Sequence, residues 1–117
     1  MTISGGLHSQ LIGQPGSRAL LNTPALVLDL ASLHANVARM AAFGRSSGLA
    51  IRPHAKSHKS ADIAHILDKN GLAGHCCAKL GEAEMLAAAG IGNLLITSPI
   101  VTEFGIKRLV VLICTES

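Results

Sequence analysis

The chain has 117 residues, of which 49% are hydrophobic and 15% are charged, and its formal net charge is +3. This length fits one ordinary domain with an aliphatic core, because the chain has two Phe and neither Trp nor Tyr. The small net charge and the shortage of aromatic side chains argue against a nucleic-acid-binding protein.

Residues 1–22 are rich in Gly, Ser and polar side chains, and they predict a flexible leader. They lack a charged segment followed by an apolar one, which argues against a secretory signal. No apolar run reaches the roughly 20 residues that cross a bilayer, so we expect no membrane partner. The adjacent cysteines Cys76 and Cys77 rarely form a bridge, which favours a reducing compartment and a cytoplasmic location.

The next segment, residues 23–48, predicts a strand followed by a helix. The strand is "TPALVLDL", residues 23–30, with Pro24 at its start, where a strand tolerates proline. Asp29 is a candidate N-cap of the helix and Gly48 its C-terminal stop. The helix is indicated by an apolar stripe at helical spacing, formed by Leu30, Leu33, Val37, Met40 and Ala41.

Residues 49–80 predict a strand, a helix and a further strand. "LAIRPHAK", residues 49–56, is the second strand, and "GHCCAKL", residues 74–80, is the third. Between them, residues 61–70 form a helix that Ser60 caps and Gly71 ends. The apolar side of this helix carries Ile63, Ile66 and Leu67, with Asn70 on the same side.

The last part of the chain continues the alternation of strands and helices. Residues 81–90 form an Ala-rich helix that Gly90 ends, and residues 93–100 form the fourth strand. A last helix is indicated by Ile106, Leu109, Val110 and Ile113, although "LVVLIC" also fits a strand. Such α/β alternation predicts parallel strands with crossover helices, either an open doubly wound sheet or part of a (β/α)8 barrel. A complete barrel takes about 250 residues, so this chain holds roughly half of one.

The stretch "LAIRPHAKSHKS", residues 49–60, gathers five basic or titratable side chains in an otherwise apolar region. On a strand, Arg52, His54 and Lys56 share one face, and Lys56 lies at the carboxyl end, where such sheets place their chemistry. Neighbouring positive charge favours the neutral, nucleophilic amine of a lysine. Lys59 breaks the alternation and is expected in the loop. The alternative is a solvated basic loop without a chemical role.

These motifs resemble a known enzyme family. The chain is similar to the N-terminal part of the D-threonine aldolase and D-serine dehydratase-like enzymes, which are fold-type III pyridoxal-phosphate (PLP) enzymes with an alanine racemase-type domain. The resemblance covers roughly residues 23–110. The motifs that carry it are "TPALVLDL", "RPHAKSHKS", "CCAKLGEAEMLAAAGI" and "LLITSPIV".

The resemblance implies a fold, a cofactor and a lysine. Residues 23–117 are expected to be the N-terminal part of a PLP-binding (β/α)8 barrel, truncated after about four β/α units and without the C-terminal β-domain. Lys56, the first lysine of the motif, is expected to form the internal aldimine. With it we predict His54 and Arg52 as cofactor-binding residues. Relatives carry a divalent metal whose ligands come from the C-terminal domain, so no metal ligand is expected here.

The implied activity is that of a lyase acting on D-amino acids. Aldol cleavage of a D-3-hydroxy amino acid and dehydration of D-serine are the two versions, with PLP as the electron sink. Full-length relatives are expected to be homodimers, and this chain alone is expected to have little activity. The alternatives are a non-catalytic PLP-binding protein of the same barrel fold and an amino-acid racemase.

Other polar residues admit both a functional and a structural interpretation. His54 and His58 have the i, i+4 spacing of zinc ligands but lack the accompanying glutamate. Three further groups, each with its structural alternative, are His75, Cys76 and Cys77 (soft-metal cluster or buried core), Lys79 and Glu82 (cofactor orientation or surface pair), and Thr97 and Ser98 (pocket or N-cap).

Overall fold

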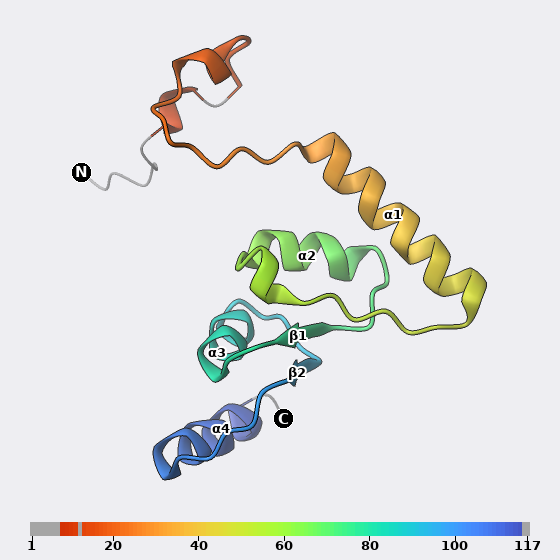
Figure 1. Ribbon diagram of the computed structural model, residues 1–117, viewed down its shortest axis with the longest axis vertical. Helices are drawn as coiled ribbons and strands as arrows, with labels where there is room; N and C mark the ends of the chain where they lie inside the picture. Colours follow the sequence, from red (N-terminus) through yellow and green to blue (C-terminus); the bar gives the residue numbers. More distant parts are fainter. Residues whose placement is uncertain (1–7, 12, 116–117) are drawn as a thin grey trace. The chain divides into compact units, whose positions relative to one another are not determined.

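The computed structural model describes residues 8–11 and 13–115, which fall into two compact units that divide after Leu30 (Figure 1). The first unit contains two short 3-10 helices, η1 (Ser9–Leu11) and η2 (Ser17–Leu20). The predicted leader therefore lies partly outside the described residues, at 1–7 and 12, and its flexibility stays a prediction. The second unit contains every α-helix and strand apart from the first residue of α1.

The strand predicted over residues 23–30 was wrong. Residues 21–29 form no strand, and helix α1 begins at Leu30. Leu26, Val27 and Leu28 are exposed, so the described residues of the first unit do not cover their apolar side chains. A strand needs a partner for its backbone hydrogen bonds, and an apolar run alone does not supply one.

Helix α1 (Leu30–Ser47) confirms the helix predicted between residues 30 and 48. It ends at Gly48, whose φ of 65° lies in the left-handed region that favours glycine. Val37, Ala41 and Gly44 are buried, whereas Met40 is exposed, so the buried stripe is narrower than the sequence indicates. The chain turns back closely here, because the Leu49 N–H donates to the Gly44 carbonyl at 2.9 Å.

Three extended segments run parallel in the second unit. Strands β1 (His75–Cys77) and β2 (Leu94–Ile96) lie side by side (Figure 1) and pair in parallel. In this pairing Cys76 lies opposite Leu95. On the other side of β1, the segment 51–54 pairs through a parallel bridge between His54 and Cys76. The Cys76 N–H donates to the Pro53 carbonyl at 2.8 Å. β1 therefore lies between the other two segments.

Residues 49–56, predicted as the second strand, are not a regular strand: they are extended up to His54, which forms one isolated parallel bridge to Cys76. After this bridge, Ala55–Ser57 form the 3-10 helix η3. The His54 ring causes this ending, because its Nδ1 accepts the backbone N–H of Lys56 at 3.3 Å and so caps the turn. The prediction that Arg52, His54 and Lys56 share one strand face was therefore wrong, since Lys56 does not lie on the strand.

Each of these three extended segments is followed by a helix, which confirms the predicted alternation for the last three of its four units. These helices are α2 (Ala61–Lys69), α3 (Leu80–Ala88) and α4 (Glu103–Thr115). Ser60 caps α2 as predicted, with its Oγ accepting the Ile63 N–H at 3.3 Å. The last segment is a helix rather than the alternative strand. Among the described residues, no helix has the length and apolar character required to cross a bilayer.

The core is small and aliphatic, in agreement with the composition. It forms where α2, α3 and η3 meet the two strands. Its buried members are Ala55, Ala64, Cys77, Ala83, Leu86 and Ile91, and the half-buried Leu94, Ile96 and Leu112 pack against them. The small, buried Ala55 lets η3 pack closely against β1, which fixes the position of the turn that carries Lys56.

Candidate active site at the carboxyl edge of the sheet

Polar side chains gather where the three parallel segments end. Parallel segments bring their carboxyl ends to one edge, and α/β proteins bind ligands there. The residues that follow the three segments are Lys56 after the first, Lys79 and Glu82 after β1, and Thr97 and Ser98 after β2. This group, which we call the carboxyl edge, contains the lysine that the sequence singles out.

Lys56 is held by its backbone and free at its side chain. Its N–H donates to His54 Nδ1, and the Ser57 N–H and hydroxyl both donate to the His54 carbonyl, at 3.4 and 3.0 Å. The residue is exposed, and among the described residues Lys56 Nζ forms no ion pair. A fixed turn thus presents an unpaired amine at the carboxyl edge.

His54 connects the first and third segments across the end of β1. Its Nε2 lies 3.4 Å from Thr97 Oγ1, and that hydroxyl donates to the Cys77 carbonyl at 3.1 Å. Because His54 Nδ1 accepts a hydrogen bond, the neutral ring carries its proton on Nε2, a tautomer that we assign from this pattern of contacts. The Nε2–H then donates to Thr97. The N-cap alternative for Thr97 was wrong, since α4 begins at Glu103 and is capped by Thr102.

Glu82 supplies a carboxylate to the same edge. Its Oε2 accepts the Ala78 N–H at 2.7 Å, and this bond is the largest cause that lowers the pKa of Glu82. The positive charge of Lys59 lowers that pKa further, as does the His54 ring when it carries a proton on both nitrogens. The Lys79–Glu82 surface pair expected as an alternative does not form, because Glu82 bonds the backbone instead.

An open cavity of about 590 Å³ adjoins this edge. Its lining includes two of the lysines on this edge together with Glu82, whereas Lys56 is not part of the lining. The lining residues are Lys59, Lys79, Leu80, Gly81, Glu82, Met85 and Arg108. Arg108 is already paired with the Glu84 carboxylate, so Lys59 and Lys79 are the lining cations that remain for an anion.

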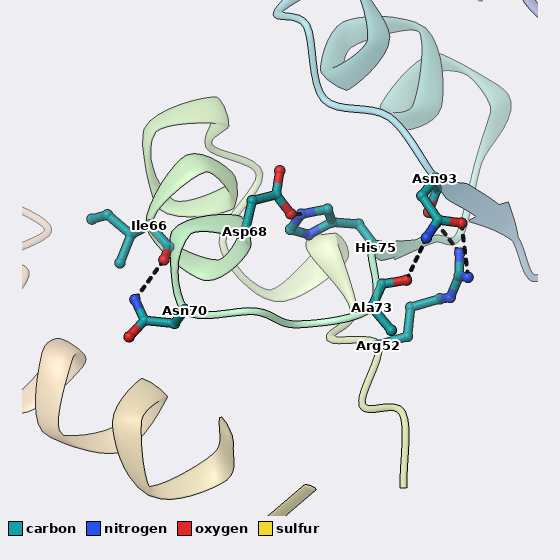
Figure 2. Close-up of polar contacts among 7 residues, drawn as sticks. All are labelled: Arg52, Ile66, Asp68, Asn70, Ala73, His75 and Asn93. Atoms are coloured by element: carbon teal, nitrogen blue, oxygen red, sulfur yellow. Dashed lines mark hydrogen bonds and ion pairs between the residues drawn. The ribbon is translucent and has the colours of Figure 1, made fainter. Parts of the chain in front are cut away.

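Arg52 lies at the opposite edge of the sheet. Its Nη1 donates to the Asn93 carbonyl at 2.6 Å and its Nη2 to Asn93 Oδ1 at 3.0 Å (Figure 2). Asn93 directly precedes β2, so this contact lies at the amino ends of the strands. The structure therefore joins His54 and Lys56 by a hydrogen bond, whereas the Arg52 guanidinium is engaged by Asn93. The cofactor-binding role of Arg52 stays a prediction.

The structure gives other roles to the two sets of residues that the sequence offers as metal ligands. The Nδ1 atoms of His54 and His58 each accept a backbone N–H two residues ahead, from Lys56 and Ser60. Cys77 is buried, and burial raises the pKa of its thiol, as expected of a core cysteine. Across residues 8–11 and 13–115, no three His, Cys, Asp or Glu side chains lie together as a metal site would require.

The sequence interpretation missed two polar contacts that Figure 2 shows. Asn93 joins Arg52 to the Ala73 carbonyl, which its Nδ2 reaches at 2.8 Å. The fully buried His75 places its Nε2 2.8 Å from Asp68 Oδ1. A histidine in an apolar strand signals that a polar partner is needed, but nothing in the sequence pattern indicates which residue supplies it.

Comparisons with known proteins agree with this architecture. Residues 28–111 match the family described as "Alanine racemase, N-terminal domain". The 3-hydroxy-D-aspartate aldolase of Paracoccus denitrificans is 37% identical over 90 residues, which are 76% of this chain and 23% of that protein.

Two solved structures superpose on the chain with a TM-score of 0.76. The D-threonine aldolase from Filomicrobium marinum is 43% identical, and the match covers 78% of this chain and 25% of that one. The D-threo-3-hydroxyaspartate dehydratase from Delftia sp. HT23 is 32% identical, with 81% and 25% covered.

The fold class is mixed α/β with a small parallel sheet and a basic carboxyl edge. The chain belongs to the alanine racemase N-terminal domain family, because the family match covers most of its length. It spans about a quarter of the length of the relatives that it matches.

Proposed function

We propose that this chain carries the cofactor lysine of a PLP-dependent lyase that acts on D-3-hydroxy amino acids. The observation that carries the proposal is the exposed amine of Lys56, presented at the carboxyl edge on a turn that His54 caps. Relatives whose names specify aldolases and a dehydratase for such amino acids support the substrate class. Aldol cleavage and dehydration are the two reactions within this proposal.

The proposed architecture is part of a (β/α)8 barrel over residues 23–117. Three parallel segments in sequence order, each followed by a helix, are the repeating unit of such a barrel. In that fold the chemistry lies at the carboxyl ends of the strands, which is where Lys56 lies. A doubly wound sheet shares these units, so the family membership favours the barrel.

The residues present fit an aldehyde cofactor with an anionic phosphate. A covalent bond to the aldehyde needs an accessible amine, which Lys56 Nζ supplies. Lys59 and Lys79 line the adjoining cavity and can hold an anion there. When bound, PLP supplies an electron sink that weakens the bonds at the substrate Cα.

The neighbouring side chains position this amine. The His54 ring holds the Lys56 backbone through Nδ1 and contacts Thr97 through Nε2, so the lysine turn is tied to the end of β2. The Glu82 carboxylate stays ionised and holds the loop after β1 through the Ala78 N–H. These bonds limit the motion of the turn, and a pre-positioned reactive group lowers the entropic part of a barrier.

Covalent trapping tests the proposal. The full chain is treated with PLP and then borohydride, and the pyridoxyl label is located by peptide mapping. We expect a dominant label on Lys56, lost in Lys56→Arg and retained in the matched control Lys59→Arg. A label that is absent, or spread over Lys59, Lys79 and Lys107 without preference for Lys56, would overturn the proposal.

A further inference from the structure

The ring of His58, two residues after Lys56, has a defined tautomer. Its Nδ1 accepts the Ser60 N–H at 3.2 Å. Burial is the largest cause that lowers the pKa of His58, so the neutral ring is favoured. A neutral ring that accepts at Nδ1 carries its proton on Nε2. This Nε2–H is buried and, within the described residues, has no hydrogen-bond partner.

The ring of His75 has the complementary arrangement. Its Nε2 faces Asp68 Oδ1 at 2.8 Å, as Figure 2 shows. An ionised carboxylate only accepts hydrogen bonds, so His75 Nε2 carries the proton in this contact. In the neutral ring Nδ1 is then an acceptor. It is buried, and no described residue donates to it.

The two rings belong to neighbouring parts of the fold. The 3-10 helix η3, which immediately precedes His58, contacts strand β1, which carries His75. The electrostatic effect of His75 is the second cause that lowers the pKa of His58. One ring offers a buried donor and the other a buried acceptor. Buried polar groups are seldom left without a partner.

We propose that Asp68, His75, His58 and the Ser60 backbone form a continuous hydrogen-bond chain that positions the Lys56 turn. In this chain one water molecule accepts from His58 Nε2–H and donates to His75 Nδ1. Asp68 thereby acts at a distance, as a positioning residue for Lys56. The hydrogen-bond chain stands on one contact at each ring and on the two buried ring nitrogens without a partner, and only its effect on Lys56 chemistry rests on the proposed function.

Asp68 sets the direction of every bond in this chain. A neutral amide at position 68 can also donate to His75 Nε2, which moves the ring proton to Nδ1. Two N–H groups would then face each other between His75 and His58. Relief of that conflict requires the His58 ring to turn or to change its tautomer, and either change breaks the bond to Ser60 that holds the end of the Lys56 turn.

Nitrogen NMR of the histidine rings tests the chain directly. In the unaltered protein at neutral pH we expect His58 and His75 both in the Nε2–H form. Asp68→Asn is expected to give mixed tautomers at both rings, and Asp68→Glu to restore them. Asp62→Asn, on the first turn of the same helix, is the control and should change neither ring. The Asp68 side chain is 38% exposed, so these variants are expected to fold.

Two results would overturn the chain: an Nδ1–H form of His75 in the unaltered protein, or His58 signals that do not respond to Asp68→Asn. The effect on Lys56 is measured by pyridoxyl labelling, which should fall several-fold in Asp68→Asn and not in Asp62→Asn. Unchanged labelling would contradict the positioning role. If the unaltered protein takes no label at all, the proposed function fails. The ring tautomers alone then test whether the hydrogen-bond chain exists.

Discussion

The two edges of the small parallel sheet are built differently. At the amino edge, Arg52 and Asn93 bond each other and the neighbouring backbone, so their polar groups are used within the fold. At the carboxyl edge, Lys56 is exposed, and Lys59 and Lys79 line a cavity. This difference indicates that the amino edge stabilises the fold and that the carboxyl edge is available for chemistry. Substitutions at the amino edge should therefore change the free energy of unfolding, and substitutions at the carboxyl edge should also change the labelling of Lys56.

The largest effect is expected at the amino edge from Gly74→Ala. Gly74 has a φ of +101°, and an added Cβ would lie 2.2 Å from the Asn93 carbonyl oxygen. Backbone strain and this clash together should lower the free energy of unfolding by about 3 kcal/mol or more. Urea denaturation measures the change.

Gly92→Ala is the matched control for that substitution. No heavy atom lies within 4 Å of the Cβ position at Gly92, so the urea midpoint should barely move. Equal effects at the two glycines would contradict the close packing of the amino edge.

A smaller loss of stability is expected from Arg52→Ala. The substitution removes two charge-assisted bonds to the exposed Asn93, and because solvent screens them they contribute about 1 kcal/mol. Pyridoxyl labelling of Lys56 should persist under native conditions. The opposite result, unchanged stability with lost labelling, would favour the cofactor-binding role that the sequence predicts for Arg52.

At the carboxyl edge, Thr97→Val should affect both readouts. The variant loses the contact with His54 and the bond to the Cys77 carbonyl, at a cost of about 1 kcal/mol in unfolding free energy. Labelling of Lys56 should slow as well, because His54 caps its turn. Thr115→Val removes only intrahelical bonds on exposed α4 and serves as the control. If Thr97→Val lowers the stability but leaves the labelling of Lys56 unchanged, the carboxyl edge would behave like the amino edge, which would contradict the proposed difference.

The smallest effect concerns the acid dependence of stability and Glu82. Its pKa is lowered in the folded state, so its contribution is complete above the ordinary pKa of a glutamate. That contribution disappears as the pH falls through the lowered, folded-state pKa. Glu82→Gln should therefore flatten the loss of stability on acidification, measured as urea midpoints over a pH series. An unchanged pH slope would show that the bond to Ala78 does not favour the carboxylate.

Local signals in the sequence predicted the helices well. Ser60 caps α2, and Gly48, Gly71 and Gly90 follow helix ends with positive φ, because caps and stops depend only on residues nearby in the chain. The alternation of these helices with short apolar runs was also sufficient to predict parallel pairing.

Long-range contacts account for what the sequence could not predict. The strand expected to reach Lys56 ends at His54, whose ring caps the turn and reaches Thr97, 43 residues later. Arg52 was assigned to the site by strand alternation, but its partner Asn93 lies 41 residues away at the other edge. The alternation of side chains along a strand predicts on which face of the sheet a residue lies, but it does not predict which distant side chain binds that residue.

The three cysteines differ in their burial, so their reactivity can report which part of the protein unfolds first. Cys114 on α4 is exposed, Cys76 is half-buried, and Cys77 lies in the core with a raised pKa. Because thiolates are the reactive form, an alkylating reagent should modify Cys114 first and Cys77 only after the core separates. Mass spectrometry of timed alkylation would thus resolve local fraying from loss of the core in one sample.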